Sequence, residues 1–292
     1  MSIFKGAATA LITPFKDGKI DYVSMGKLVQ WQLEQGIDAL VVCGTTGESS
    51  TLTNIEKINL VKFVVDLVNK RVPVLAGTGT NSTKVSLKLS KEMERTGADG
   101  LLIVTPYYNR CSDSGLIEHY ETIADQVNLP IIMYSVPSRT GVNINSHVVK
   151  ELSKHPNIVG IKEASGNISQ ICASAAHICD DFDIYSGNDD QTIPIMSLGG
   201  MGCISTVSNI IPKRYSQMIH NYLKGDTKKA ADEQIAIKPL IDTMFSEVNP
   251  IPVKYALSLM GMCYPEYRLP LCLPENKTQY ALYDTLEEYN LI

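Results

Sequence analysis

The chain has 292 residues, of which 44% are hydrophobic and 20% are charged. This length allows two ordinary domains or one large α/β barrel with an appendage, and the composition is that of a folded globular protein. The 26 basic and 31 acidic side chains give a net charge of −5, without a block of like charges. We therefore expect no nucleic-acid partner, because binding to phosphates requires a concentrated basic face.

The lengths of the apolar runs and the number of cysteines limit further which class of protein this can be. The apolar runs are strand-length, such as residues 39–43 and 101–104, and fall short of the roughly 18 residues that span a bilayer. The N-terminal run stops at Pro14 and predicts a first strand rather than a secretory signal. Seven cysteines, an odd number without a C-x-x-C motif, favour reduced thiols. We expect a cytoplasmic protein without a membrane segment or a metal site.

Short apolar runs alternate with longer helical patterns, and each run ends in a loop rich in Gly, Thr, Asn or Pro. There are eight such runs, and they are apolar on both faces, as is typical of parallel strands covered by helices. They occupy residues 6–13, 38–43, 72–77, 100–105, 130–134, 158–162, 184–187 and 202–206.

The segments between the runs carry helix signals. Thr53 and Glu56 form a capping box, and Gly36 and Gly97 stand where left-handed C-caps are expected. Amphipathic spacing predicts helices over residues 114–127, 146–152 and 168–178. After the eighth run only helical patterns follow, over residues 214–223, 228–245, 252–259 and 276–289.

This order of elements predicts a (β/α)₈ TIM barrel with a C-terminal helical appendage. We expect a catalytic barrel over residues 1–224 and a helical domain over residues 225–292. The competing architecture is an open, doubly wound sheet, which would place a crevice at a switch point.

Active sites of such barrels lie at the carboxyl ends of the strands, which makes the residues there candidates. Lys162 closes the sixth run, where burial would favour the neutral amine that attacks a carbonyl carbon. It could instead extend to solvent or pair with Glu163. Tyr134 closes the fifth run and could transfer a proton, or be a core aromatic. Arg139 could hold a carboxylate, or be a solvated loop residue.

Two glycine-rich loops follow strands. Residues 44–48, Gly-Thr-Thr-Gly-Glu, could bind a carboxylate or a phosphate through backbone N–H groups. Residues 77–81 resemble a dinucleotide fingerprint only in part, because Ser82 replaces the third glycine, and we expect an ordinary turn there. No serine-hydrolase elbow and no metal-ligand spacing occurs.

Five motifs in order resemble the 4-hydroxy-tetrahydrodipicolinate synthase (dihydrodipicolinate synthase) family over nearly the whole chain. They are residues 44–48, 107–110 (Tyr-Tyr-Asn-Arg), 134–141 (Tyr-Ser-Val-Pro-Ser-Arg-Thr-Gly), 160–166 (Gly-Ile-Lys-Glu-Ala-Ser-Gly) and 186–189 (Ser-Gly-Asn-Asp). This family belongs to the pyruvate-dependent class I aldolase superfamily, with N-acetylneuraminate lyase. The resemblance implies a lyase of lysine and diaminopimelate biosynthesis that condenses pyruvate with L-aspartate 4-semialdehyde.

The resemblance also implies the catalytic residues. Lys162 would form a Schiff base with pyruvate, so that no separate cofactor is needed. Tyr134, Thr46 and Tyr108 would form a proton relay, with Tyr108 supplied by a neighbouring chain. A homotetramer built as a dimer of dimers is the corresponding expectation.

Substrate contacts follow from the same resemblance. Thr45 and Thr46 would bind the pyruvate carboxylate, and Arg139 the semialdehyde carboxylate. Gly187 and Ile204 would line the pocket around the lysine.

Departures from related sequences refine this interpretation. Neuraminate lyases typically carry Ser-Thr in place of Thr45-Thr46 and lack an arginine at position 139, and both differences favour the synthase. Cys111 stands where many synthases have a proline, which leaves φ unrestricted in the loop that carries Tyr108.

Feedback inhibition by lysine is expected to be weak or absent. Ser49, Asn81 and Tyr107 match an effector site of lysine-inhibited relatives, whose remaining contacts are histidines and a glutamate. In this chain those other positions hold Asn54, Lys57 and Val85. The site would lose a carboxylate for the ligand's ammonium group and gain a like charge.

Two other functions stay open from the sequence. One is a different aldolase or dehydratase of the same superfamily, which Arg139 and assays with sugar acids would distinguish. The other is a non-catalytic or phosphate-binding barrel, which borohydride trapping with pyruvate would exclude.

Overall fold

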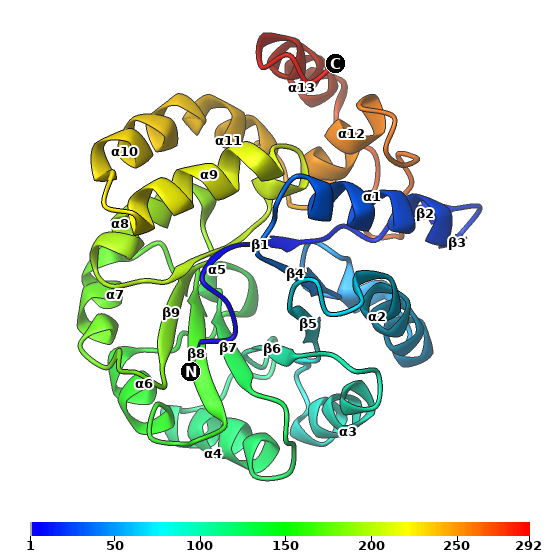
Figure 1. Cartoon of the computed structure of the whole chain (residues 1–292). Coiled ribbons are helices and arrows are strands. Elements are labelled where there is room, and N and C mark those ends of the chain that lie inside the picture. Colours follow the sequence, from blue (N-terminus) through cyan, green and yellow to red (C-terminus); the bar gives the residue numbers. More distant parts are fainter. Residues whose placement is uncertain (1) are drawn as a thin grey trace.

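The computed structural model describes residues 2–292 and contains a closed barrel of eight parallel strands (Figure 1). Around the barrel the strands are β1 (Gly6–Ala10), β10 (Gly202–Ser205), β9 (Asp183–Ser186), β8 (Ile158–Glu163), β7 (Ile131–Ser135), β6 (Gly100–Val104), β5 (Val74–Gly77) and β4 (Ala39–Val42). Each of the eight predicted runs overlaps one of these strands, and β7, β8 and β9 each extend one residue beyond the predicted run. The predicted (β/α)₈ barrel is confirmed, and the open sheet is excluded because β1 pairs with both β10 and β4.

The barrel closes where β1 meets β10. Gly6 lies opposite Gly202 in this pair. Gly202 has a φ of +145°, and a Cβ added there would lie 1.8 Å from the carbonyl oxygen of Gly6. Only glycine therefore permits this approach of the two backbones. Alternate residues of the strands point inward and form a buried cluster that includes Ala8, Tyr185 and Ile204.

A ring of helices surrounds the barrel (Figure 1). These are α1 (Tyr22–Glu34), α2 (Asn54–Val68), α3 (Thr83–Glu94), α4 (Asp113–Ala124), α6 (Ser146–Leu152), α7 (Ile168–Ala175), α8 (Thr192–Ser197) and α9 (Pro212–Leu223). The predicted capping box of α2 is confirmed, with the N–H of Glu56 donating to Thr53 Oγ1 over 3.2 Å. Gly36 and Gly97 have the expected positive φ values of +78° and +83°. Local signals therefore set the ends of these helices.

Four helices follow α9: α10 (Thr227–Ala236), α11 (Lys238–Met244), α12 (Ile251–Leu259) and α13 (Asn276–Glu288). In Figure 1 the orange and red segments, α12 and α13, lie outside the ring. The prediction of one helix over residues 228–245 is wrong, because the helix is interrupted between α10 and α11. Pro239 lacks the N–H that a continuous helix would need at this point. The division of the chain after residue 224 stays a prediction.

Short elements that local sequence signals did not predict connect the longer ones. They are β2 (Phe15–Lys16), β3 (Lys19–Ile20), α5 (Pro137–Thr140), η1 (Ser49–Thr51), η2 (Asp189–Gln191) and η3 (Val207–Asn209). Several of them stand at the carboxyl ends of barrel strands, where the candidate residues lie. None of the helices over residues 2–292 is long and apolar enough to cross a membrane.

His119 is a buried histidine between two helices of the ring. It lies on α4, and its Nδ1 is 2.9 Å from the Thr83 hydroxyl of α3, while Nε2 has no partner among residues 2–292. Burial lowers the pKa of His119 to about 4, because the charged imidazolium would be poorly solvated there.

His119 should therefore contribute a loss of stability on acidification. Since its imidazole binds a proton near pH 6.5 in the unfolded chain and only near pH 4 in the folded chain, the His119 contribution to the free energy of unfolding falls as pH drops between these values, by about 3 kcal/mol in total. Chemical denaturation at pH 7 and pH 4.5 measures this loss. His119→Gln should show a shallower pH dependence, and equal slopes for both proteins would contradict the assignment.

Candidate active site

A cavity of about 270 Å³ opens at the carboxyl ends of the strands. Its lining includes Thr45 from the loop after β4, Tyr107 from the loop after β6, Tyr134 from β7 and Arg139 from α5. Parallel strands bring these loops together because all their carboxyl ends meet at one face of the barrel. Residues that are far apart in the chain thus share one cavity.

Lys162 lies at the inner end of this site. In the barrel register it stands between Tyr134 of β7 and Tyr185 of β9, and it is only 5% exposed. Its Nζ is 4.3 Å from the centroid of the Tyr134 ring. Lys162 does not itself line the cavity, whereas Tyr134 does. A molecule in the cavity therefore meets Tyr134 before Lys162.

Glu163 does not neutralise Lys162. Its side chain accepts from the backbone N–H of Ser165 over 2.6 Å and from Gln170 over 3.5 Å. Burial raises the pKa of Glu163. No carboxylate among residues 2–292 pairs with Lys162, so both alternatives considered for this lysine, extension to solvent and pairing with Glu163, are wrong.

Gly187 lies against Lys162, and Ile204 belongs to the buried inner cluster of the barrel. A Cβ added at Gly187 would be 3.0 Å from Lys162 Cε and 2.8 Å from the Ala164 Cβ. A side chain there would displace the lysine or its neighbour. Ile204 of β10 is fully buried in the same inner cluster as Tyr134. The interior thus holds Lys162 among apolar and aromatic groups.

The Gly-Thr-Thr-Gly-Glu loop presents a fixed hydroxyl and free backbone donors. Thr46 is 2% exposed, and its Oγ1 is 3.3 Å from Thr206 Oγ1. Asn249 Nδ2 donates to the same Thr46 oxygen over 3.0 Å. The backbone N–H groups of Thr45 and Thr46 donate to no group in the described part of the chain. This arrangement suits a small anion, because two adjacent backbone donors are unpaired and Thr45 lines the cavity.

Arg139 stands at the mouth of the cavity and is exposed. Its Nη2 donates to the carbonyl oxygen of Asn249 over 3.2 Å. Asn249 therefore touches both Thr46 and Arg139, although sequence reasoning assigned it no role. The only local signal was an Asn-Pro pair before a helical segment.

Tyr108 is the one predicted relay residue that the single chain does not bring to the site. It is 93% exposed, with a φ of +74°. It lines a shallow hollow beside the cavity together with Arg110 and Arg139, and it makes no contact with Tyr134 or Thr46. In one chain, then, only Tyr134 and Thr46 of the three predicted relay residues lie at the site.

The predicted effector residues divide into two groups. Ser49, Lys57 and Tyr107 line the cavity, whereas Asn81, which matched the same effector site, does not. Lys57 is 6% exposed and pairs with no carboxylate among residues 2–292. Burial lowers the pKa of Lys57. The cavity wall at this point is basic rather than acidic.

Asp189 is a buried residue that contacts the segment after β10, and sequence reasoning gave it no role beyond its motif. Its buried carboxylate accepts from the backbone N–H groups of Thr206 over 3.1 Å and Val207 over 3.3 Å, and also from Ser205 Oγ. Burial raises the pKa of Asp189. This carboxylate holds Thr206, the hydroxyl neighbour of Thr46, in place.

Comparisons with known proteins show the family of this chain. The model of the dihydrodipicolinate synthetase family matches residues 3–289. A 4-hydroxy-tetrahydrodipicolinate synthase of Caldicellulosiruptor saccharolyticus is 50% identical over 292 residues, which are 100% of this chain and 99% of that protein. The dihydrodipicolinate synthase structure of Thermotoga maritima is 43% identical with a TM-score of 0.98, covering 100% of both chains. A dihydrodipicolinate synthase of Acinetobacter baumannii, solved in complex with pyruvate, is 40% identical with a TM-score of 0.96 and covers 99% of both chains.

Proposed function

The chain belongs to the dihydrodipicolinate synthetase family, and we propose that Lys162 is the residue on which it carries out the family's reaction. That reaction condenses pyruvate with L-aspartate 4-semialdehyde to give 4-hydroxy-tetrahydrodipicolinate, in lysine and diaminopimelate biosynthesis. The observation that carries the proposal is the Lys162 amine, which is 5% exposed, lies 4.3 Å from the Tyr134 ring centroid and has no carboxylate partner in the described chain.

Lys162 acts as a covalent nucleophile. Its amine nitrogen attacks the ketone carbon of pyruvate, and loss of water leaves an imine. Loss of a methyl proton converts the imine into an enamine, whose carbon attacks the aldehyde of the second substrate. The amino group of the semialdehyde then closes the ring on the former ketone carbon and releases the lysine. The covalent adduct takes the place of a separate cofactor.

Tyr134 and Thr46 move the protons of these steps. Tyr134 is the aromatic residue next to the amine, and the Thr46 hydroxyl is held by Asn249 and Thr206. Tyr108 of a neighbouring subunit completes the relay, and its nearly full exposure in a single chain supports that role. Such groups contribute when they lie within hydrogen-bond reach of the reacting atoms.

Two carboxylates are bound in the cavity, each by its own set of donors. The unpaired backbone donors of Thr45 and Thr46 bind the carboxylate of pyruvate near the lysine. Arg139 binds the carboxylate of the semialdehyde at the mouth, through its planar pair of donors. Asn249 holds the arginine in place through its carbonyl oxygen. The odd number of cysteines without a C-x-x-C motif supports a cytoplasmic location.

Lys162→Ala should abolish covalent capture of pyruvate. Because alanine supplies no amine, borohydride reduction with pyruvate should add no mass to the variant, and kcat should fall by at least about 10³-fold. Intact mass spectrometry and peptide mapping measure the adduct. Lys57→Met is the matched control, since it removes the other buried lysine of this region and should still trap pyruvate. An adduct on the Lys162→Ala variant would contradict the assignment.

Arg139→Ala should weaken use of the semialdehyde far more than that of pyruvate. Loss of a charged pair of hydrogen bonds should lower kcat/KM for the semialdehyde by roughly 10- to 100-fold, while pyruvate trapping continues. Steady-state kinetics with each substrate varied in turn separates the two effects. Arg110→Ala changes only the outer hollow and serves as the control. Loss of trapping with normal semialdehyde kinetics would assign Arg139 to the other carboxylate.

The active enzyme is a homotetramer built as a dimer of dimers, with Tyr108 shared between neighbours. Mixing inactive Tyr108→Phe subunits with inactive Lys162→Ala subunits should then restore part of the activity, because one hybrid site contains both native residues. Native mass spectrometry verifies subunit exchange. Exchange without any recovery of activity would argue against a shared site.

Lysine should inhibit this enzyme weakly or not at all. Lys57 lines the cavity together with Ser49 and Tyr107, and none of the residues that line it is acidic, so that an effector's ammonium group would meet a like charge without a carboxylate to pair with. A tenfold loss of affinity needs only about 1.4 kcal/mol. A lysine titration at saturating substrates measures the response, with Lys57→Glu tested for increased sensitivity. Half-inhibition of the native enzyme below 1 mM, on the order of a physiological concentration, would contradict the prediction.

A further inference from the structure

Glu48 and Lys254 form an ion pair that is completely removed from solvent. Both side chains are 0% exposed, although the residues lie 206 positions apart in the chain. Glu48 ends the Gly-Thr-Thr-Gly-Glu loop, and Lys254 lies on α12. Charges buried in this way are strongly unfavourable unless they are paired and hydrogen-bonded in a fixed geometry. The pair thus joins one catalytic loop to the C-terminal helices at a defined distance.

Further contacts restrict both partners of the ion pair. Glu48 Oε2 accepts from the backbone N–H of Arg268 over 3.3 Å. Lys254 Nζ donates to the Glu266 carbonyl oxygen over 3.0 Å and lies 4.3 Å from the centroid of the Phe15 ring. Glu48 also adopts a left-handed backbone conformation, with a φ of +52°. Neither side chain has freedom to re-orient without breaking several contacts.

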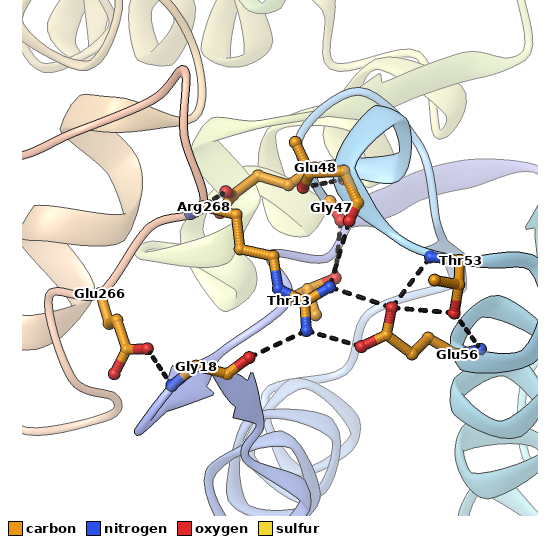
Figure 2. Close-up of polar contacts among 9 residues, drawn as sticks. Thr13, Gly18, Gly47, Glu48, Thr53, Glu56, Glu266 and Arg268 are labelled. Atoms are coloured by element: carbon orange, nitrogen blue, oxygen red, sulfur yellow. Dashed lines mark hydrogen bonds and ion pairs between the residues drawn. The ribbon is translucent and has the colours of Figure 1, made fainter.

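A second contact set holds the same loop, as Figure 2 shows around Arg268. The Arg268 guanidinium donates to both carboxylate oxygens of Glu56, over 2.9 and 2.6 Å, and to the Thr51 carbonyl oxygen over 3.1 Å. Thr13 Oγ1 donates to the Gly47 carbonyl oxygen over 2.7 Å. The segment from Gly47 to Glu56 is therefore anchored at several points.

These anchored residues are close in the chain to Thr46 and Asn249, which meet at the Thr46 hydroxyl. Thr46 stands two residues before Glu48, and Asn249 stands two residues before the first residue of α12. Asn249 Nδ2 donates to Thr46 Oγ1 over 3.0 Å. The loop and the helix segment that meet in this hydrogen bond are the same two segments that the Glu48–Lys254 pair joins.

We propose that Glu48 and Lys254 are positioning residues for the condensation: their buried ion pair seats α12 on the loop after β4 and thereby aligns the Thr46 hydroxyl through Asn249. This inference rests on the proposed function, because it assigns to the pair an effect on a relay residue. Neither side chain touches the cavity, so each acts only through Thr46.

The competing explanation is that the pair only stabilises the fold. A double-mutant cycle with Thr46 separates the two, because a positioning residue has no further effect once the group it positions is gone. Lys254→Met should lower kcat by roughly 10- to 100-fold in the native background, since small misplacements of a reacting group cost that much. In a Thr46→Val background the same substitution should lower kcat by less than about threefold.

A matched control uses another side-chain contact that joins a helix to the barrel. His220 of α9 lies 2.9 Å from Asp38, which precedes β4 at the opposite end of the barrel from the cavity. His220→Asn should reduce the melting temperature but keep kcat within about twofold. If Lys254→Met does not fold, Arg268→Gln replaces it. That variant removes the contacts to Glu56 and Thr51 and should lower kcat several-fold in the native background only.

Three results are decisive. Equal fold-losses of kcat in the native and Thr46→Val backgrounds would overturn the positioning role, as would a destabilised Lys254→Met or Arg268→Gln variant with native kcat. Loss of kcat confined to the native background would establish it. Borohydride trapping of pyruvate on the unmodified protein is measured in parallel, and failure of that reaction would contradict the proposed function itself.

Discussion

Closure of the parallel sheet is the constraint on which the rest of the molecule depends. The approach of β1 to β10 leaves no space for a side chain at Gly202, whose Cβ would collide with the Gly6 carbonyl oxygen. Once the ring is closed, every strand ends at the same face, and the loops that follow the strands converge there. Thr45, Tyr134 and Lys162 gather for this reason, although their loops and strands share no sequence signal.

The buried lysines of this protein differ in whether a carboxylate pairs with them. Three lysines, Lys57, Lys162 and Lys254, are more than nine-tenths buried, and only Lys254 pairs with a carboxylate. A paired buried lysine contributes to structure, whereas an unpaired one keeps its amine available. The protein therefore contains one buried lysine that a carboxylate pairs and two, Lys57 and Lys162, that no carboxylate among residues 2–292 pairs.

The C-terminal helices form part of the site as well as covering the barrel. Asn249 reaches Thr46 and Arg139 from the segment before α12. Arg268, which follows α12 in the chain, donates its backbone N–H to Glu48 of the loop after β4 (Figure 2). The loop has backbone hydrogen bonds of its own, from Gly47 to Gly44 and from Glu48 to Thr45, and these long-range contacts add further anchors. Residues near the end of the chain thus contact the segments that form the barrel mouth.

The sequence by itself determined the eight strands, the capping box of Thr53 and Glu56, and the motif residues Lys162 and Tyr134, because hydrophobic period, capping chemistry and motif order are local properties. Only the tertiary structure decided which distant groups meet. The Asn249 contact to Thr46 and the Glu48–Lys254 pair join residues more than 200 positions apart, and no local pattern encodes such a pairing. Burial likewise follows from packing, which is why a strand-end lysine could not be distinguished from a solvated one until the barrel had closed around it.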